Sequence, residues 1–225
     1  ICYPNLPVII VGTGSGLSYA SLGATHHSME DISILRTLPN LQIICPADQK
    51  EVRQAVIKAY ESNKPTYIRL GKKGEPTIHE DTPNFEIGKS IILKRGNDIS
   101  LLGVGSALSI ARECEEELFT NNIKSDLISF HTPKPIDGEL LEKLFQTKKY
   151  IVIIEEHGLI GGVGSAVLEW ANENKYDTRK IIRFGGPDKF LTGCGNQNEA
   201  RKLIGLSSDN IRQKILEVLK KKWLL

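Results

Sequence analysis

The sequence predicts an α/β fold made of two tandem three-layer units with mostly parallel sheets, and three observations favour it. Short apolar runs alternate with amphipathic segments along the 225 residues, as strands and their covering helices do in parallel sheets. Glycine-rich stretches follow two of the apolar runs, at residues 12–16 and 158–164. A polar, turn-rich stretch at residues 71–88 separates the two series of elements. We therefore expect one unit at residues 1–86 and a second at residues 87–225.

The first unit is predicted to alternate strands with a loop and two helices. A strand at residues 7–11 enters a loop that carries four glycines before residue 31. Ser28 and Asp31 form an S-x-x-D pattern, which predicts a capping box for a helix through Thr37. The remaining predicted elements are a strand at 41–45, a helix opened by Asp48 and Glu51, and a strand at 65–70.

The second unit is predicted to repeat this alternation. Its expected strands lie at 90–94, 99–104, 126–130, 150–155 and 180–184, and its expected helices at 106–120, 137–147, 165–174 and from Ser208 onward. Gly96 and Asn97 lie between the first two of these strands. We expect the two strands to pair as a hairpin around this glycine-containing turn.

Composition and charge exclude several classes of protein. The net charge is +2, from 29 basic and 27 acidic residues, and the short lysine clusters lack the interleaved aromatic residues of a nucleic-acid-binding surface. No apolar run approaches the ~20 residues that span a bilayer. Cys2, Cys45, Cys114 and Cys194 have neither a paired arrangement nor metal-ligand spacing. We therefore expect free buried thiols in a reducing cytoplasm, and no metal site on this chain.

The glycine patterns do not complete a nucleotide-binding motif. Gly12, Gly14 and Gly16 follow a predicted strand, but no helix opens directly after them. The patterns at residues 103–105 and 161–164 lack the third glycine or the acidic residue that a dinucleotide fold requires. Tight turns and close packing of helices on strands are the preferred interpretation.

His26 and His27 end the glycine-rich loop, just before the predicted helix. A helix N-terminus disfavours a protonated imidazole, so a neutral side chain is expected there, able to hydrogen-bond a substrate carbonyl or hydroxyl. A histidine that only braces the loop is the alternative. Lys72 follows the strand at 65–70, at the edge of a parallel sheet where ligands bind. It is either an anion-binding residue or a solvated one.

The other histidines give weaker signals. His157 follows Glu155 and Glu156 at the end of a predicted strand. It is either an acid–base residue beside two carboxylates or, as we prefer, a residue that braces a loop or an interface. His79 and His131 are predicted to be surface loop residues.

Several collinear motifs carry a family resemblance. The first unit contains Gly23-Ala24-Thr25-His26-His27, then Leu38-Pro39-Asn40 and Pro46-Ala47-Asp48. The second contains T-P-K-P-I-D at 132–137, E-E-H at 155–157, G-G-V-G-S at 161–165 and G-P-D-K-F at 186–190. Together they resemble the transketolase family, and the second set is similar to the C-terminal domain of transketolases and deoxyxylulose-phosphate synthases. The resemblance places the later part of a pyrimidine-binding domain at 1–86 and a transketolase C-terminal domain at 87–225.

The resemblance implies a thiamine-diphosphate enzyme that transfers a two-carbon ketol unit between sugars or sugar phosphates. The G-D-G…N-N motif that holds magnesium and diphosphate in the family is absent from the sequence, as is the glutamate that activates the aminopyrimidine. We therefore expect thiamine diphosphate with Mg²⁺ to bind only jointly with a diphosphate-binding domain or N-terminal subunit. The implied assembly is a homodimer or α2β2. Ile1 starts the chain without a methionine or signal peptide, so we expect it to begin inside the pyrimidine-binding domain.

The family's functional residues carry over by position. His26 matches the histidine that faces the thiazolium and contacts substrate oxygens, and His27 beside it is expected to bind substrate. Lys72 matches an arginine that binds substrate phosphate; lysine keeps the charge but loses the bidentate fork. Leu22 stands where the family has an acidic residue for the acceptor hydroxyl, and Gly14 stands where it has a second histidine. These two departures predict an altered substrate.

Two alternatives to a transketolase stay open. The β subunit of a 2-oxo acid dehydrogenase shares the pair of domains, although the T-H-H sequence at 25–27 argues against it. The alternative from another class is a non-catalytic subunit whose C-terminal domain serves only assembly or dimerisation.

Overall fold

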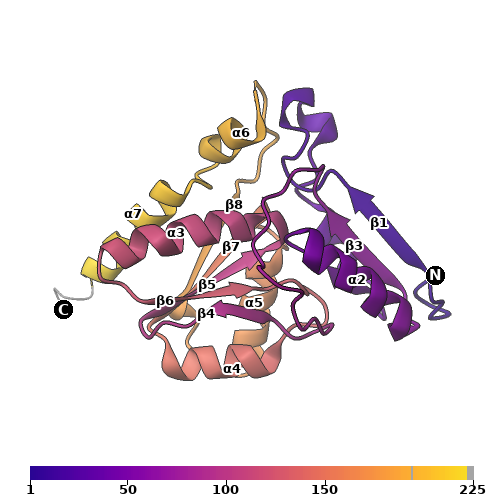
Figure 1. Ribbon diagram of the computed structural model, residues 1–225, viewed down its shortest axis with the longest axis horizontal. Helices are drawn as coiled ribbons and strands as arrows, with labels where there is room; N and C mark the ends of the chain where they lie inside the picture. Colours follow the sequence, from indigo (N-terminus) through magenta and orange to yellow (C-terminus); the bar gives the residue numbers. More distant parts are fainter. Residues whose placement is uncertain (194, 222–225) are drawn as a thin grey trace.

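The computed structural model describes residues 1–193 and 195–221 as an α/β structure with two sheets. The smaller sheet has the order β1-β3-β2 and is parallel throughout. Its strands are β1 (Ile9–Thr13), β2 (Gln42–Ile44) and β3 (Thr66–Leu70). Since β1 and β3 run in parallel register over their full length, both strands end at the same edge of the sheet (Figure 1).

The two helices of this unit differ in how they begin. Asp48 caps helix α2 (Gln49–Ser62) by accepting two backbone N–H hydrogen bonds from its first turn, which confirms the predicted start. The predicted capping box at Ser28 is wrong. Helix α1 (Asp31–Leu35) is only five residues long and has no side-chain cap bond. The backbone of Ser28 instead pairs with Gly16 across the loop, at 2.9 Å in both directions, so this residue stays outside the helix.

The larger sheet has five strands in the order β4-β6-β5-β7-β8 and is parallel except for the edge strand β4. The strands are β4 (Ile91–Lys94), β5 (Ile99–Val104), β6 (Ser125–Ser129), β7 (Tyr150–Gly158) and β8 (Ile181–Gly186). The helices are α3 (Leu108–Thr120), α4 (Gly138–Thr147), α5 (Val163–Glu173), α6 (Gln197–Leu203) and α7 (Ser208–Lys221), with 3-10 turns η3 (Gly105–Ala107) and η4 (Thr178–Lys180).

The predicted hairpin between β4 and β5 is wrong. Strand β4 pairs antiparallel with β6, and Ile91 lies opposite Ser129. Both edges of β5 are taken by the parallel strands β6 and β7, so β4 cannot pair with β5 and instead extends the sheet beyond β6. The connection is held against β6 by the N–H of Gly96, which donates to the Asp126 carboxylate at 2.8 Å.

Helices cover both faces of the larger sheet, which gives the layered α/β arrangement that the sequence predicts (Figure 1). Successive side chains of β5 point to opposite faces. Leu101 packs in a cluster with residues of α3 and α7, whereas Leu102 packs in a cluster with residues of α4 and α5. Both side chains are fully buried, so β5 is a central strand with an apolar core on each side.

The two sheets share part of their core. The cluster that contains Leu102 also contains Ile32 and Ile43 from the smaller unit. Backbone hydrogen bonds cross between the units, because the N–H of Ile43 donates to the Lys134 carbonyl at 2.8 Å. The loops of the smaller unit are therefore held at fixed positions against the larger one.

No helix in the described part of the chain is both long and apolar enough to cross a bilayer. Cys2, Cys45 and Cys114 are free thiols, and the last two are buried. This confirms free thiols at these three positions, with Cys2 only half-buried; Cys194 lies outside the described residues.

Candidate functional site

The glycine-rich loop after β1 lies against the segment that follows β3. The N–H of Gly14 donates to the Gly71 carbonyl at 3.2 Å, and the N–H of Ser15 donates to the Leu70 carbonyl at 2.9 Å. The loop then forms two 3-10 turns, η1 (Ala20–Leu22) and η2 (Ala24–His26). The loop that carries His26 and the segment that carries Lys72 thus leave the same edge of one parallel sheet.

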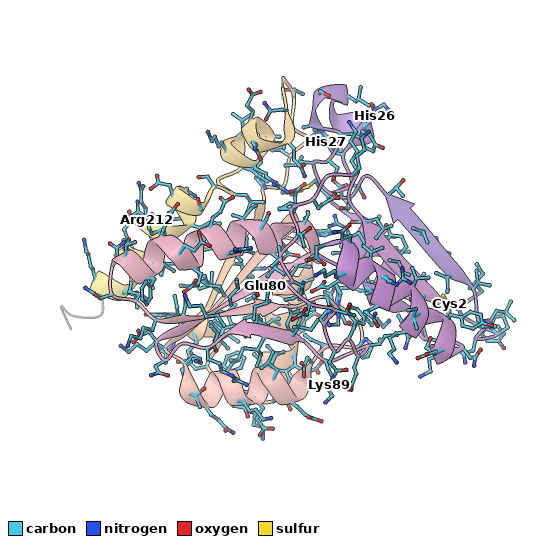
Figure 2. All side chains as sticks on the ribbon, in the orientation of Figure 1. Cys2, His26, His27, Glu80, Lys89 and Arg212 are labelled. Atoms are coloured by element: carbon cyan, nitrogen blue, oxygen red, sulfur yellow. The ribbon has the colours of Figure 1, made fainter. Side chains whose placement is uncertain are left out.

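His26 lies at the end of η2 with its side chain exposed. Its Nδ1 lies 3.1 Å from the hydroxyl of Thr25. The expected position at a helix N-terminus is wrong, since α1 begins only at Asp31 and is short. The helix-dipole argument for a neutral imidazole therefore does not apply to His26. Figure 2 shows His26 on the outer side of its loop, on the surface of the molecule.

His27 is half-buried and has a bracing contact within its own loop. Its Nε2 lies 3.3 Å from the Ala20 carbonyl oxygen. The side chain also lines a cavity of about 430 Å³ between the two units. The other lining residues are Ala24 of η2 and residues around the start of α1, the end of β7 and the end of β8, including Glu30, Gly158 and Phe190.

Lys72 is exposed and contacts an aromatic ring of the glycine-rich loop. Its Nζ lies 5.1 Å from the centroid of the Tyr19 ring, a cation–π distance. Lys72 lines a second cavity, of about 400 Å³, at the carboxyl ends of β1, β2 and β3. His27 and Lys72 thus line different cavities and His26 lines neither of them, so the three residues do not form one enclosed pocket within this chain.

A buried arginine holds the base of the loop. Arg69, on β3, donates from Nε to the Asp31 carboxylate at 2.8 Å and from Nη2 to the Ser28 carbonyl at 2.7 Å. It also reaches the Glu156 carbonyl at 3.1 Å. Burial raises the pKa of Asp31, but the Arg69 charge together with the hydrogen bonds from Arg69 and Tyr67 outweighs burial and leaves this pKa below its usual value. Asp31 is therefore ionised near neutral pH and serves as the structural partner of Arg69.

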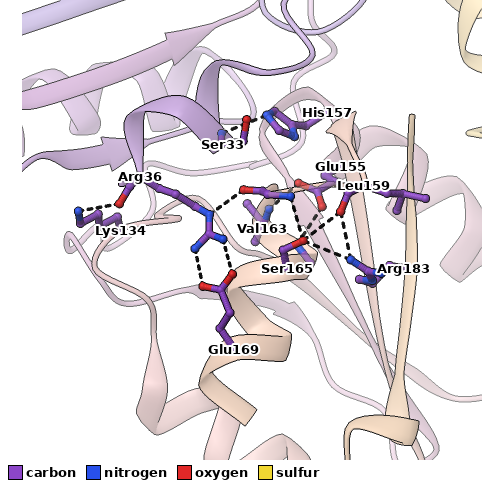
Figure 3. A network of polar contacts seen from close by, with 12 residues as sticks. Ser33, Arg36, Lys134, Glu155, His157, Leu159, Val163, Ser165, Glu169 and Arg183 are labelled. Atoms are coloured by element: carbon purple, nitrogen blue, oxygen red, sulfur yellow. Dashed lines mark hydrogen bonds and ion pairs between the residues drawn. The ribbon is translucent and has the colours of Figure 1, made fainter. Parts of the chain in front are cut away.

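The sequence Glu155-Glu156-His157 braces loops, which is the interpretation we preferred for His157. The Glu156 carboxylate accepts from the N–H of Leu17 at 2.6 Å and so fixes the glycine-rich loop. His157 accepts from the N–H of Ser33 at 3.3 Å through Nε2 (Figure 3). Burial and the nearby Arg69 lower the pKa of His157 to about 4, so its ring is neutral near neutral pH and serves as an acceptor.

Glu155 is bound to the first turn of α5. Its carboxylate accepts from the N–H groups of Val163 and Gly164 at 2.7 and 2.9 Å (Figure 3). Burial raises the pKa of Glu155 to about 7 despite these hydrogen bonds. Both hydrogen bonds are those of a helix cap, so Glu155 fixes the start of α5 against β7.

His79 and His131 are buried, so the prediction of surface positions is wrong. The Asp48 carboxylate accepts from the backbone N–H of His79 at 3.0 Å and lies 3.2 Å from its Nδ1. The His131 ring stacks on Phe85 with 3.9 Å between centroids, and burial lowers its pKa to about 3. The turn-rich composition of residues 71–88 predicted a linker between the units, and side chains of both units bind this segment.

Two contacts were missed by sequence reasoning. Arginine is almost never fully buried without a partner, so a lone arginine in the apolar strand at 65–70 was the available signal for the Arg69–Asp31 pair. The contact between Tyr19 and Lys72 had no such signal, because it depends on how two loops meet. In the described residues, no group of three or more histidine, cysteine or acidic side chains is arranged to hold a metal ion.

Two sequence families match this chain. Residues 2–76 match the family described as "Transketolase, pyrimidine binding domain", and residues 88–211 match "Transketolase, C-terminal domain". An apulose-4-phosphate transketolase subunit of Phocaeicola vulgatus is 32% identical over 222 residues, which cover 98% of this chain and 70% of the relative. The 1-deoxy-D-xylulose-5-phosphate synthase 1 of Geobacter metallireducens is also 32% identical, but the match covers only 35% of that enzyme.

A solved structure agrees with these matches. The structure titled "Split gene transketolase, inactive beta4 tetramer" superposes with a TM-score of 0.88 at 33% identity. The superposition covers 98% of this chain and 69% of that one. With its fold, its two family matches and these relatives, the chain belongs to the transketolase family.

Proposed function

We propose that this chain is the C-terminal section of a thiamine-diphosphate-dependent, transketolase-like transferase that moves a two-carbon ketol unit between sugars or sugar phosphates. The observation that carries the proposal is the meeting of the His26 loop with the Lys72 segment at the carboxyl edge of a parallel sheet. Ligands of α/β sheets bind at such an edge. In this proposal residues 1–86 are the later part of a pyrimidine-binding domain, and residues 87–225 are the C-terminal domain.

Each proposed site residue has a role that its position permits. The exposed imidazole of His26 hydrogen-bonds a substrate hydroxyl or carbonyl oxygen and orients it. The Lys72 ammonium binds a phosphate group of the substrate as a point charge. His27, half-buried and bonded to Ala20, binds substrate at the inner side of the loop and keeps the loop in shape.

A partner subunit is part of the proposal. The relative from Phocaeicola vulgatus is named as one subunit of a transketolase, and the solved split transketolase is titled an inactive β4 tetramer. By analogy, a diphosphate-binding domain or N-terminal subunit covers the exposed His26 and completes the site. An assembly of the α2β2 kind, or a homodimer, in the cytoplasm fits this proposal.

Thiamine diphosphate supplies the electron sink for ketol transfer when it is bound. The described residues offer no cluster of metal ligands, so their donor set does not fit the metal–diphosphate end of the cofactor. We propose that the partner holds Mg²⁺ and the diphosphate, while this chain contributes the side chains that face the substrate. The chain alone is then inactive.

The experiment that tests this function is a reconstitution. The chain, expressed as its gene encodes it, is mixed with candidate diphosphate-domain subunits, thiamine diphosphate and Mg²⁺, and ketol transfer is followed with a panel of sugar phosphates. We expect transfer only in the mixture, and a fall in kcat of about 100-fold or more for His26→Ala. A His26→Ala variant with a normal rate would instead favour the non-catalytic assembly subunit.

A further inference from the structure

The ring of Tyr19 fills the space directly above Gly14. A Cβ atom placed on Gly14 would lie 2.4 Å from Cε2 of Tyr19, far inside contact distance. Gly14 also has a φ of +84°, which favours glycine over any residue with a side chain. No histidine side chain fits at position 14 while the Tyr19 ring keeps its position. The glycine at position 14 and the tyrosine at position 19 therefore depend on each other.

The same ring lies beneath the ammonium group of Lys72. The 5.1 Å between Nζ and the ring centroid is within the range of a cation–π contact. The backbone on both sides is fixed by the hydrogen bond from Gly14 to the Gly71 carbonyl. Tyr19 is therefore held between Gly14 and Lys72, and it restricts the flexible lysine side chain to one region of the sheet edge.

We propose that Tyr19 is a positioning residue that determines substrate specificity: its ring occupies the space over Gly14 and holds the Lys72 ammonium ready for the phosphate group of a sugar substrate. The inference rests on the proposed function, because that function gives Lys72 its anion. Lysine has a compact charge on a long stem with high rotamer entropy. A ring that already restricts this stem lowers the entropy lost when phosphate binds.

The first test does not need the partner or the cofactor. Acetylation of Lys72 by acetic anhydride is followed by mass spectrometry in the full chain, with Lys73 as the internal reference. The wild type and Tyr19→Phe are expected to react alike, because both keep the ring. Tyr19→Leu is expected to react about two- to fivefold faster, the size of an exposed cation–π contact. Equal rates in the three proteins would overturn the proposal.

The second test uses the reconstituted enzyme. Tyr19→Leu is expected to raise KM for phosphorylated substrates by about two- to fivefold, with kcat and the KM for unphosphorylated sugars unchanged, and Tyr19→Phe is expected to restore the wild-type KM. Tyr60, which is 78% exposed on α2, gives the matched control Tyr60→Leu. A Tyr19→Leu effect on kcat, or on all substrates alike, would mean a merely structural role.

The outcomes separate this inference from the function on which it rests. If Lys72→Ala raises KM for phosphorylated substrates and Tyr19→Leu does not, the Tyr19 proposal fails and the proposed function stands. If neither substitution changes KM but Tyr19→Leu speeds acetylation of Lys72, the ring contact exists and the phosphate role is wrong. Thermal unfolding of each variant identifies any that has lost its fold. If Tyr19→Leu has, Tyr19→Met, which also removes the ring, takes its place in the acetylation assay with the same expected and contradicting results.

Discussion

Arg69 is a buried cation on β3 that binds the loop before α1 in its own unit and the end of strand β7 in the other unit. It has 3% of its surface exposed, and its partners are the Asp31 carboxylate and the carbonyls of Ser28 and Glu156. A buried charge is tolerated only when it is paired and hydrogen-bonded. Arg69 meets this condition by contacts that also fix the later end of the loop carrying His26.

Replacing this arginine is expected to destabilise the fold strongly. Arg69→Met leaves the largely buried Asp31 carboxylate without its cation, so the free energy of unfolding is expected to fall by about 3–5 kcal/mol. Denaturant titration of the wild type and the variant measures this difference in the free energy of unfolding. The control is Arg112→Met, which breaks an exposed pair with Glu116 and is expected to cost less than about 1 kcal/mol. Losses of similar size in the two variants would contradict the role given to Arg69.

The phosphate-binding role proposed for Lys72 predicts that its removal weakens the binding of phosphorylated substrates only. Lys72→Ala is expected to raise KM for phosphorylated substrates about tenfold or more, the size of a lost charge-assisted hydrogen bond, while unphosphorylated sugars are little affected. Steady-state kinetics of the reconstituted enzyme measure the difference. Lys143→Ala, at an exposed position on α4, removes one charge elsewhere and serves as the control. Equal effects on both kinds of substrate would contradict phosphate binding at this residue.

At the scale of elements, α1 and β7 are coupled through a neutral histidine. His157, at the end of β7, accepts from the N–H of Ser33 on α1. Its pKa in the folded chain is about 4, against an ordinary value of 6.5. Between these two values the unfolded chain binds a proton at this residue that the folded chain does not bind. The stability that His157 contributes is therefore complete above pH 6.5 and is lost as the pH falls toward 4.

This coupling predicts a pH-dependent effect of His157→Gln, which keeps an acceptor but does not titrate. The destabilisation caused by the substitution is expected to shrink by about 1.4 kcal/mol per pH unit as the pH falls from 6.5 to 4. Unfolding titrations of both proteins across this range give the difference directly. A pH-independent difference would show that His157 titrates alike in the folded and unfolded chains.

Most elements follow from local patterns, and the errors arise where distant segments meet. Apolar periodicity predicted the strands, and Asp48 and Asp137 were correctly expected to start helices. Helix α6 was missed because it is short and polar, although Asn196 and Glu199 form a capping box that was the available signal. The β4 pairing depended on which edge of the sheet stays free, and no local pattern contains that information.

The candidate site was predictable to the same extent. The positions of His26 and Lys72 at one sheet edge follow from the order of strands and loops. Bracing of the loop by Glu156, which binds the N–H of Leu17 across 139 positions of sequence, could not be predicted. Such contacts arise only when the two units pack, and the same holds for the burial of His79 and His131.

At the scale of the whole molecule, the site faces outward. His26 is exposed, and Leu22 beside it on the same loop is 54% exposed. On β1, Ile10 and Val11 are 42% and 48% exposed, although the strands of parallel sheets are normally covered on both faces. These surfaces fit a chain that is completed by another domain or subunit, which is the central claim of the proposed function.

Calorimetric titration with thiamine diphosphate and Mg²⁺ tests this claim most directly. The chain is titrated alone, a candidate diphosphate-domain subunit is titrated alone, and then the two are titrated together. The account predicts stoichiometric binding in the mixture and none by this chain alone. Tight binding by this chain alone would contradict the account, and so would a failure of every candidate subunit to restore binding.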